Sequence, residues 1–263
     1  MDLGLKDRVA IVAASSQGLG KAVALGLARE GTKLALCART PARLEAAAED
    51  IRQETGADIL ARPADLTQEA QVRGLVEATL ERFGRLDIAV ANAGGPPSKP
   101  FAATTVEDWE SAVRLNLMST LHLARAALPA MQRRRWGRFL AITSVAVKQP
   151  VEGLVLSNSV RLAVVGLVKT LANEYGRDNI LVNNLCPGYT LTARLDELAA
   201  TLAQAQSVEV AEVHRRWAAQ VPLGRLATPE EFANVAVFLA SERASYITGS
   251  SIAVDGGLIK GVL

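Results

Sequence analysis

Hydrophobic positions along the chain fall into short runs that are separated by longer stretches with helical spacing. The runs have the length of β-strands and lack strict alternation of apolar and polar residues. They lie at Val9–Ala13, Leu34–Ala38, Ile59–Ala61, Ile88–Ala91, Phe139–Thr143, Leu181–Leu185 and Ile252–Val254. Between them apolar residues recur about every 3.6 residues, most clearly at Ala22–Arg29, Leu44–Arg52, Val72–Phe83 and Leu162–Leu171.

This alternation of strands and helices predicts a single α/β domain. Strands without an alternating pattern are typical of a parallel sheet that helices cover on both faces. We therefore predict one doubly wound parallel sheet of the Rossmann type across residues 1–263. No internal repeat, low-complexity segment or interdomain linker divides the chain.

The segment from Leu191 to Gln220 interrupts the regular alternation. It has helical spacing and is rich in Ala, Glu and Arg, and it precedes a helix that begins at Pro229-Glu230-Glu231. Ligands of doubly wound folds bind beyond the carboxyl ends of the strands, so an excursion at this point suits a helical lid over a substrate. An ordinary pair of surface helices fits the same pattern.

Composition narrows the class of protein. Of the 263 residues 49% are hydrophobic, which supports a packed core, and 29 basic against 27 acidic residues give no sign of a nucleic-acid partner. The first residues carry no signal-peptide core, and no apolar run approaches the roughly 20 residues that cross a bilayer. We expect a cytoplasmic protein without a membrane span. Cys37, Cys186, His122 and His214 have no metal-site spacing, and the two cysteines are expected to be buried thiols.

A glycine-containing turn after the first predicted strand indicates a nucleotide site. Glycine at this turn lets the backbone approach a pyrophosphate, whose charge is met by the N-terminus of the following helix. The turn reads Ala14, Ser15, Ser16, Gln17, Gly18, Leu19 and Gly20. Two glycines alone are a weak signal, but other segments stand at the expected distances from them.

From about Leu5 to Leu258 the chain resembles the short-chain dehydrogenase/reductase family, most closely its 3-oxoacyl-acyl-carrier-protein reductase branch. The matching segments are Gly18-Leu19-Gly20, Ala64-Asp65-Leu66-Thr67, Ala91-Asn92-Ala93-Gly94, Asn116, Thr143-Ser144, Pro187-Gly188-Tyr189-Thr190-Leu191-Thr192 and Asp255-Gly256-Gly257. The resemblance implies a homodimer or homotetramer.

The resemblance also implies which residues contact the cofactor. The turn from Ser15 to Gly20 would bind the pyrophosphate, and Asp65 and Leu66 would flank the adenine. The ribose side would be lined by Asn92, Ala93 and Gly94, while the nicotinamide side would be closed by Pro187, Gly188, Tyr189, Thr190 and Thr192. Ala14 and Ala91 depart from the family pattern, which has glycine and asparagine at these positions, and this weakens the expected binding.

The end of the second predicted strand bears on the choice of cofactor. An NAD-preferring site places a carboxylate there for the ribose hydroxyls. This chain has Ala38 followed by Arg39, whose guanidinium can bind a 2′-phosphate. We therefore predict NADP(H) in preference to NAD(H), although a solvated arginine with no part in cofactor choice fits the same residue.

The resemblance implies a catalytic serine, a tyrosine thirteen residues later, a lysine four residues beyond it and an asparagine on the preceding helix. Ser144 and Asn116 match the serine and the asparagine, whereas the tyrosine and lysine positions hold Ser157 and Arg161. A serine hydroxyl titrates several units above a phenol and is a poor proton donor. Arg161 keeps the positive charge and is expected to contact the nicotinamide ribose.

Two residues are candidates for a substitute proton donor. Lys148 stands four residues after Ser144, and Tyr189 lies in the segment expected beside the nicotinamide. Each also fits an ordinary role, Lys148 as a solvated loop residue and Tyr189 as a packing residue.

These observations favour an NADP(H)-binding oxidoreductase that reduces a small-molecule carbonyl, or oxidises an alcohol, through a non-standard proton relay. An alternative is a catalytically degenerate member that binds a nucleotide or another ligand and acts as a regulator.

Overall fold

One parallel sheet organises the molecule, and the computed structural model describes residues 1–262 of the chain. The strand order is β3-β2-β1-β4-β5-β6-β7, so the direction of strand succession reverses between β1 and β4. The strands are β1 (Val9–Ala13), β2 (Lys33–Cys37), β3 (Ile59–Ala61), β4 (Ile88–Ala91), β5 (Gly137–Ile142), β6 (Ile180–Pro187) and β7 (Ser251–Val254). The predicted doubly wound sheet is confirmed.

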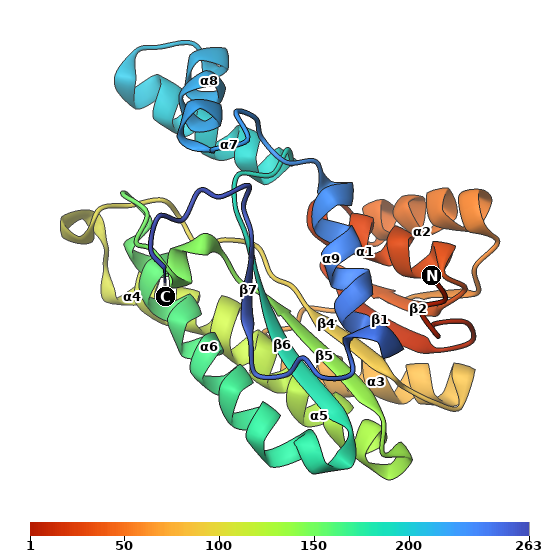
Figure 1. Cartoon of the computed structure of the whole chain (residues 1–263). Helices are drawn as coiled ribbons and strands as arrows, with labels where there is room; N and C mark the ends of the chain where they lie inside the picture. Colours follow the sequence, from red (N-terminus) through yellow and green to blue (C-terminus); the bar gives the residue numbers. More distant parts are fainter. Residues whose placement is uncertain (263) are drawn as a thin grey trace.

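Helices cover both faces of the sheet (Figure 1). One face packs against α1 (Gly18–Arg29), α2 (Pro41–Thr55) and α9 (Pro229–Ala240), and the other against α3 (Glu69–Phe83), α5 (Ser119–Arg134) and α6 (Val155–Tyr175). Successive strand residues enter opposite cores, as Val12 and Ile11 of β1 do. Because both faces are buried, the strands show no apolar and polar alternation in sequence.

The observed element boundaries follow local chemistry. β1, β3 and β4 match the predicted runs, and the other strands shift by one or two residues at an end. The helices extend beyond their apolar cores because their ends are fixed by other residues. Pro41 opens α2 and Gly56 ends it in the left-handed conformation, and a reciprocal capping box joins Thr228 and Glu231 at the start of α9.

Helix α6 is longer than its apolar spacing predicted. Together with the following turn η4 (Gly176–Asp178), it is long and apolar enough by length and composition to cross a bilayer, which corrects the expectation that no segment has this length. In this fold α6 is a partly buried core helix, with Val164 and Val168 packed against the sheet.

The segment that interrupts the sequence pattern forms a helical hairpin, α7 (Ala193–Gln206) and α8 (Val210–Gln220). The predicted helical structure is confirmed. The hairpin projects beyond the carboxyl edge of the sheet (Figure 1) and has a small core of its own, built on Ala199, Ala203 and Val213. Its two ends are held together because the backbone of Ala227 pairs with the segment from Tyr189 to Leu191.

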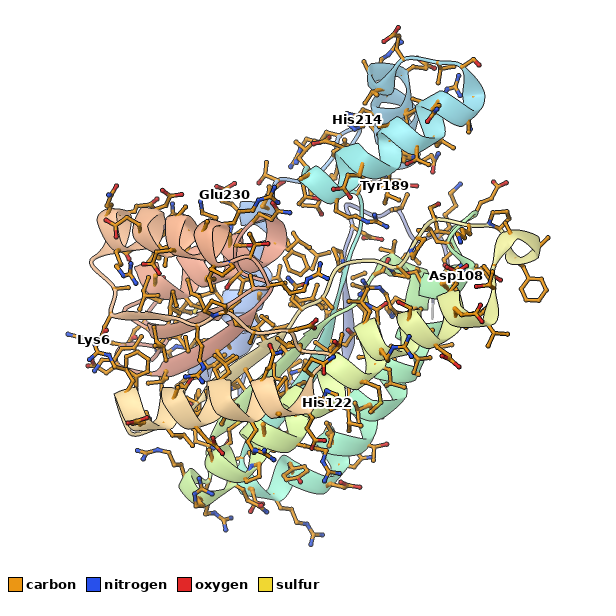
Figure 2. All side chains as sticks on the ribbon, turned by 180° about the vertical axis from the view of Figure 1, so that it is seen from behind. Lys6, Asp108, His122, Tyr189, His214 and Glu230 are labelled. Atoms are coloured by element: carbon orange, nitrogen blue, oxygen red, sulfur yellow. The ribbon has the colours of Figure 1, made fainter. Side chains whose placement is uncertain are left out.

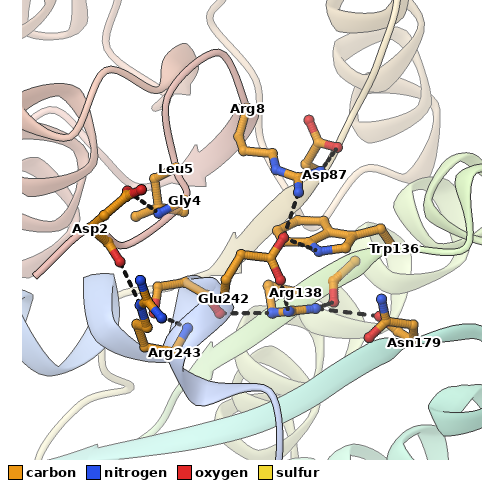
Figure 3. A network of polar contacts seen from close by, with 12 residues as sticks. Asp2, Gly4, Leu5, Arg8, Asp87, Trp136, Arg138, Asn179, Glu242 and Arg243 are labelled. Carbon is orange, nitrogen blue, oxygen red and sulfur yellow. Dashed lines mark hydrogen bonds and ion pairs between the residues drawn. The ribbon is translucent and has the colours of Figure 1, made fainter.

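A polar network lies at the opposite, amino edge of the sheet (Figure 3). The guanidinium carbon atoms of Arg8 and Arg138 lie 3.7 and 4.1 Å from the ring centre of Trp136. Glu242 Oε1 accepts hydrogen bonds from Arg8 Nη2 at 2.6 Å and from Trp136 Nε1 at 2.9 Å, and Glu242 Oε2 lies 3.6 Å from Arg138 Nη2. Burial lowers the pKa of Arg138 to about 10.

Both cysteines are free and buried, as the sequence predicted. Burial raises the pKa of the Cys37 thiol to about 12, so this thiol is not a nucleophile at neutral pH.

Candidate active site

A cavity of about 280 Å³ opens at the carboxyl edge of the sheet. Its walls come from the turn after β1, the segments that follow β4, β5 and β6, and the starts of α6 and α7. Such a crevice, where the strand order reverses, is the usual ligand site of doubly wound folds. The predicted site residues that line it are Gln17, Gly18, Leu19, Asn92, Ala93, Gly94, Ser144, Ser157, Arg161, Pro187, Gly188, Thr190 and Thr192.

The remaining predicted site residues lie outside the lining. Arg39, Asp65 and Leu66 follow β2 and β3, the strands that lie on the side of β1 away from β4. Arg39 is exposed there, so its side chain is free to meet a ligand. The full set outside the lining is Ser15, Ser16, Gly20, Arg39, Asp65, Leu66, Asn116, Lys148 and Tyr189.

The turn after β1 has the shape that a diphosphate requires. Gly18 has a φ of 57°, and a Cβ on Gly20 would lie 2.3 Å from the carbonyl oxygen of Ala14. Helix α1 starts without a side-chain cap from Gln17 and without an acidic residue in its first turn. Its positive end therefore faces the cavity with no competing carboxylate, and the residues present fit a bound diphosphate.

The backbone adopts the same turn at Ala14, although this residue is not a glycine. Its φ of 49° lies in the left-handed region, so the chain retains the turn rather than moving the backbone away. For a residue with a Cβ this conformation costs roughly 1–2 kcal/mol.

Asn116 supports the cavity from behind. It lies in a π-helical segment, η2 (Val113–Met118), between α4 (Val106–Ala112) and α5. Its Nδ2 donates to the carbonyl oxygen of Gly94 at 3.0 Å, and its buried Oδ1 has no hydrogen-bond partner within residues 1–262. Asn116 thus positions the Gly94 segment and leaves one acceptor open.

Two serines, thirteen residues apart in the sequence, line the cavity. Ser144 follows β5 and accepts a hydrogen bond from the backbone N–H of Ala146 at 3.1 Å, which caps η3 (Val145–Val147). Ser157 lies in the first turn of α6 and is buried on the cavity wall. Both side chains supply hydroxyls, and no phenol lines the described cavity.

The guanidinium of Arg161 is directed toward backbone oxygens. Its Nη1 donates to the carbonyls of Ile142 and Thr143 at 3.2 and 3.0 Å, and its Nη2 donates to that of Gly94 at 3.3 Å. Burial, with a smaller effect of the Arg194 charge, lowers the pKa of Arg161 to about 10, so it stays protonated at neutral pH. Arg161 therefore ties α6 to the ends of β4 and β5.

Neither candidate for a substitute proton donor lines the cavity. Lys148 is exposed after η3. Tyr189 stacks on Trp217 of α8, with ring centres 4.9 Å apart, and burial raises the pKa of Tyr189. Figure 2 places Tyr189 at the foot of the hairpin and His214 farther along it, away from His122.

Sequence reasoning missed Arg194, which lines the cavity from the first turn of α7. Its Nη2 donates to the carbonyl oxygen of Pro96 at 2.8 Å. A basic residue in the first turn of a helix opposes the helix dipole, and such a local conflict often marks a functional position. That signal was present in the sequence after the N-cap Thr192.

The sheet order, the turn and the cavity define a dinucleotide-binding α/β protein. A family model described as Enoyl-(Acyl carrier protein) reductase matches residues 13–259. The chain is 33% identical over 258 residues to the 3-oxoacyl-acyl-carrier-protein reductase FabG of Aquifex aeolicus strain VF5, covering 98% of this chain and 100% of that protein. This chain belongs to the short-chain dehydrogenase/reductase family.

Solved structures agree with this assignment. L-sorbose reductase from Gluconobacter frateurii, complexed with NADPH and L-sorbose, is 35% identical with a TM-score of 0.95, and the match covers 100% of both chains. A 7α-hydroxysteroid dehydrogenase complexed with NADH is 30% identical with a TM-score of 0.89, covering 100% of this chain and 98% of the other. These relatives are oxidoreductases that act on a carbonyl or hydroxyl group with either nicotinamide cofactor.

Proposed function

We propose that this chain is an NADP(H)-dependent oxidoreductase that interconverts a small-molecule carbonyl and its alcohol through a proton relay without tyrosine. One observation carries the proposal. The nucleotide turn and the segments that follow β4, β5 and β6 surround one cavity at the reversal of strand order, and Ser144 and Ser157 stand on its wall.

The cofactor contacts in this proposal follow the walls of the site. The turn from Ser15 to Gly20 holds the diphosphate, Asp65 and Leu66 flank the adenine, and Arg39 pairs with the 2′-phosphate. Residues 92–94 line the ribose, and residues 187–192 close over the nicotinamide end. When bound, the cofactor supplies or accepts the hydride.

The residues of the chain orient the substrate and supply the remaining proton. Ser144 donates a hydrogen bond to the substrate oxygen, while Asn116 and Arg161 hold the Gly94 segment in place. Ser157 and Arg161 occupy the tyrosine and lysine positions of the resemblance. Because a serine hydroxyl is a weak acid, proton transfer through Ser157 is slow.

A second candidate function is a nucleotide-binding regulator without turnover. It is favoured by the three carbonyl oxygens that already surround the Arg161 guanidinium, which leave this cation little freedom to assist a proton transfer.

We further propose a cytoplasmic homodimer or homotetramer in which the α7–α8 hairpin acts as a lid. The exposed apolar side chain of Leu162 on α6 supports an assembly surface, and the separate core of the hairpin supports movement as a unit.

The test begins with titrations of NADPH and NADH against the protein and its Arg39→Ala variant. We expect NADPH to bind more tightly, and the substitution to weaken NADPH alone by about 1.5–3 kcal/mol, the range for charge-assisted hydrogen bonds. Arg73→Ala, on the exposed side of α3, is the charge-matched control. Equal affinities before and after the Arg39 change would contradict the cofactor assignment.

A panel of ketones and alcohols then separates the two functions. Turnover with bound NADPH supports the oxidoreductase, whereas tight binding without turnover across the panel supports the regulator.

A further inference from the structure

The cavity has an unbalanced charge. Among its described lining residues only Arg161 and Arg194 are ionisable, and neither aspartate nor glutamate lines it. Both guanidinium groups contact the same short segment after β4. Arg161 donates to the Gly94 carbonyl at 3.3 Å, and Arg194 donates to the Pro96 carbonyl at 2.8 Å.

The two cations are close enough to affect each other. The charge of Arg194 contributes, after burial, to the lowered pKa of Arg161. Within residues 1–262 the hydrogen-bond partners of Arg161 are neutral carbonyls, and no carboxylate there forms an ion pair with it. Among the described residues the ion-pair partner of Arg194 is Glu197 at 3.4 Å, whose side chain is 66% exposed and therefore a weak counter-charge.

Arg194 also carries more N–H donors than its described contacts use. A guanidinium carries five N–H groups, and the contacts with Pro96 and Glu197 are the partners that the described structure gives it. A guanidinium binds a carboxylate through two parallel hydrogen bonds. Beside it the cavity wall is apolar, formed by Pro96, Leu154, Leu195 and Leu198.

We propose that Arg194 is a specificity residue that binds the carboxylate of an oxo-acid substrate, with Arg161 adding positive potential and the leucines packing its apolar chain. This inference rests on the proposed oxidoreductase function and adds the substrate class. A diphosphate is the competing anion, but the turn after β1 and the start of α1 already fit that group. Arg194 instead lies against Gly95 and Pro96, next to the apolar wall.

The experiment compares 4-methyl-2-oxopentanoate with its methyl ester, which differ in charge and share the carbonyl and the chain. Binding to the NADPH complex is followed by the fluorescence of bound NADPH. We expect the acid to bind at least about 10-fold more tightly than the ester, and Arg194→Gln to weaken the acid by about 10- to 100-fold, leaving the ester and NADPH unchanged. Arg215→Gln, an exposed arginine of α8, is the control.

Two outcomes overturn the proposal. In one, the acid and the ester bind equally to the NADPH complex. In the other, Arg194→Gln weakens NADPH as much as the acid, which assigns the arginine to the cofactor diphosphate. The acid and ester are also compared by thermal shift with the protein alone. If NADPH does not bind, the oxidoreductase proposal fails. The carboxylate site at Arg194 is then tested independently, by whether the free protein is stabilised more by the acid than by the ester.

Discussion

Arg161 lies one turn after Ser157 on α6. Its guanidinium is surrounded by backbone carbonyls from the segments that end β4 and β5. A lysine ammonium at this position reaches fewer of the three oxygens, because it lacks the planar fork. Tyrosine at position 157 requires a neighbouring cation that is free to lower the pKa of its phenol. The two positions are therefore coupled, and changing one alone leaves an incomplete site.

We predict that Ser157→Tyr combined with Arg161→Lys creates or raises carbonyl reductase activity by roughly 10²-fold or more, since a positioned acid contributes roughly 10²- to 10⁴-fold. Each single change should do little for turnover, and Arg161→Lys alone should lower the free energy of unfolding by about 1–3 kcal/mol through lost hydrogen bonds. A double-mutant cycle on kcat/KM with NADPH and a small ketone, with denaturant unfolding in parallel, measures both effects.

The matched control is Ser157→Phe with Arg161→Lys, which supplies the ring without the hydroxyl and should not raise turnover above that of the unchanged chain. High turnover by the unchanged chain, abolished by the double substitution, would show instead that the chain has an effective relay of its own.

The sequence predicted the residue types of this site better than the directions of their side chains. The spacing from Ser144 located Ser157 and Arg161, and the structure places all three at one cavity. The hydrogen-bond partners of the Arg161 guanidinium could not be predicted. Its acceptor at Gly94 is 67 residues away in the sequence, and the two residues meet only because β4 pairs with β5.

At the scale of elements, an aromatic stack holds the α7–α8 hairpin at its base. Trp217 of α8 stacks on Tyr189, which follows β6, with an angle of 11° between the rings. Arg194 of α7 also donates to the carbonyl oxygen of Pro96, and the hairpin has a small core of its own. Opening of the hairpin therefore breaks the stack and the hydrogen bond from Arg194 to Pro96, while the core within the hairpin stays intact.

We predict that Trp217→Ala speeds hydrogen exchange in α7 and α8 by about 2- to 12-fold, because such a stack contributes about 0.5–1.5 kcal/mol. Exchange of the sheet should not change. Mass spectrometry of deuterium uptake by peptides from both regions provides the measurement, with the exposed Arg215→Ala as the comparison on the same helix. Unchanged hairpin exchange, or faster exchange throughout the sheet, would contradict this view of the contact.

The apolar runs predicted where the strands and helices lie along the chain. They did not predict the residues at which these elements begin and end. The run at Ile59–Ala61 coincides with β3, a partly buried strand at the edge of the sheet. The π-helical turn that carries Asn116 had no sequence signature. It forms where the contact with Gly94 and the packing of α4 against α6 meet.

At the scale of the whole molecule, the network at the amino edge joins parts of the chain that are far apart in sequence. Glu242, near the end of the chain, contacts Arg8 and Trp136 (Figure 3). It is also the ion-pair partner of Arg138, which is fully buried. Loss of its charge leaves two guanidinium groups on either side of one indole ring.

We predict that Glu242→Gln lowers the free energy of unfolding by about 1–2 kcal/mol, since the amide keeps an acceptor but loses the charge. For a chain of this size that corresponds to a fall in Tm of roughly 2–8 °C. Thermal unfolding measured by circular dichroism tests this, and Glu54→Gln, in an exposed pair with Arg29, should change stability by no more than about 0.5 kcal/mol. NADPH affinity should not change, because the network lies at the edge away from the cavity. An equal loss of unfolding free energy from both substitutions would mean that the network stabilises the protein no more than an exposed ion pair does.

The separation of these two edges bears on how such a chain diverges over evolutionary time. Residues that hold the sheet together through charge gather at one edge, while the hydroxyls and guanidinium groups of the cavity gather at the other. Mutations of cavity side chains that, unlike Arg161, make no hydrogen bonds to the strand ends can therefore alter the reaction while the opposite edge sustains folding. A lineage built in this way can explore new substrates through inactive or slow intermediates without losing a folded protein.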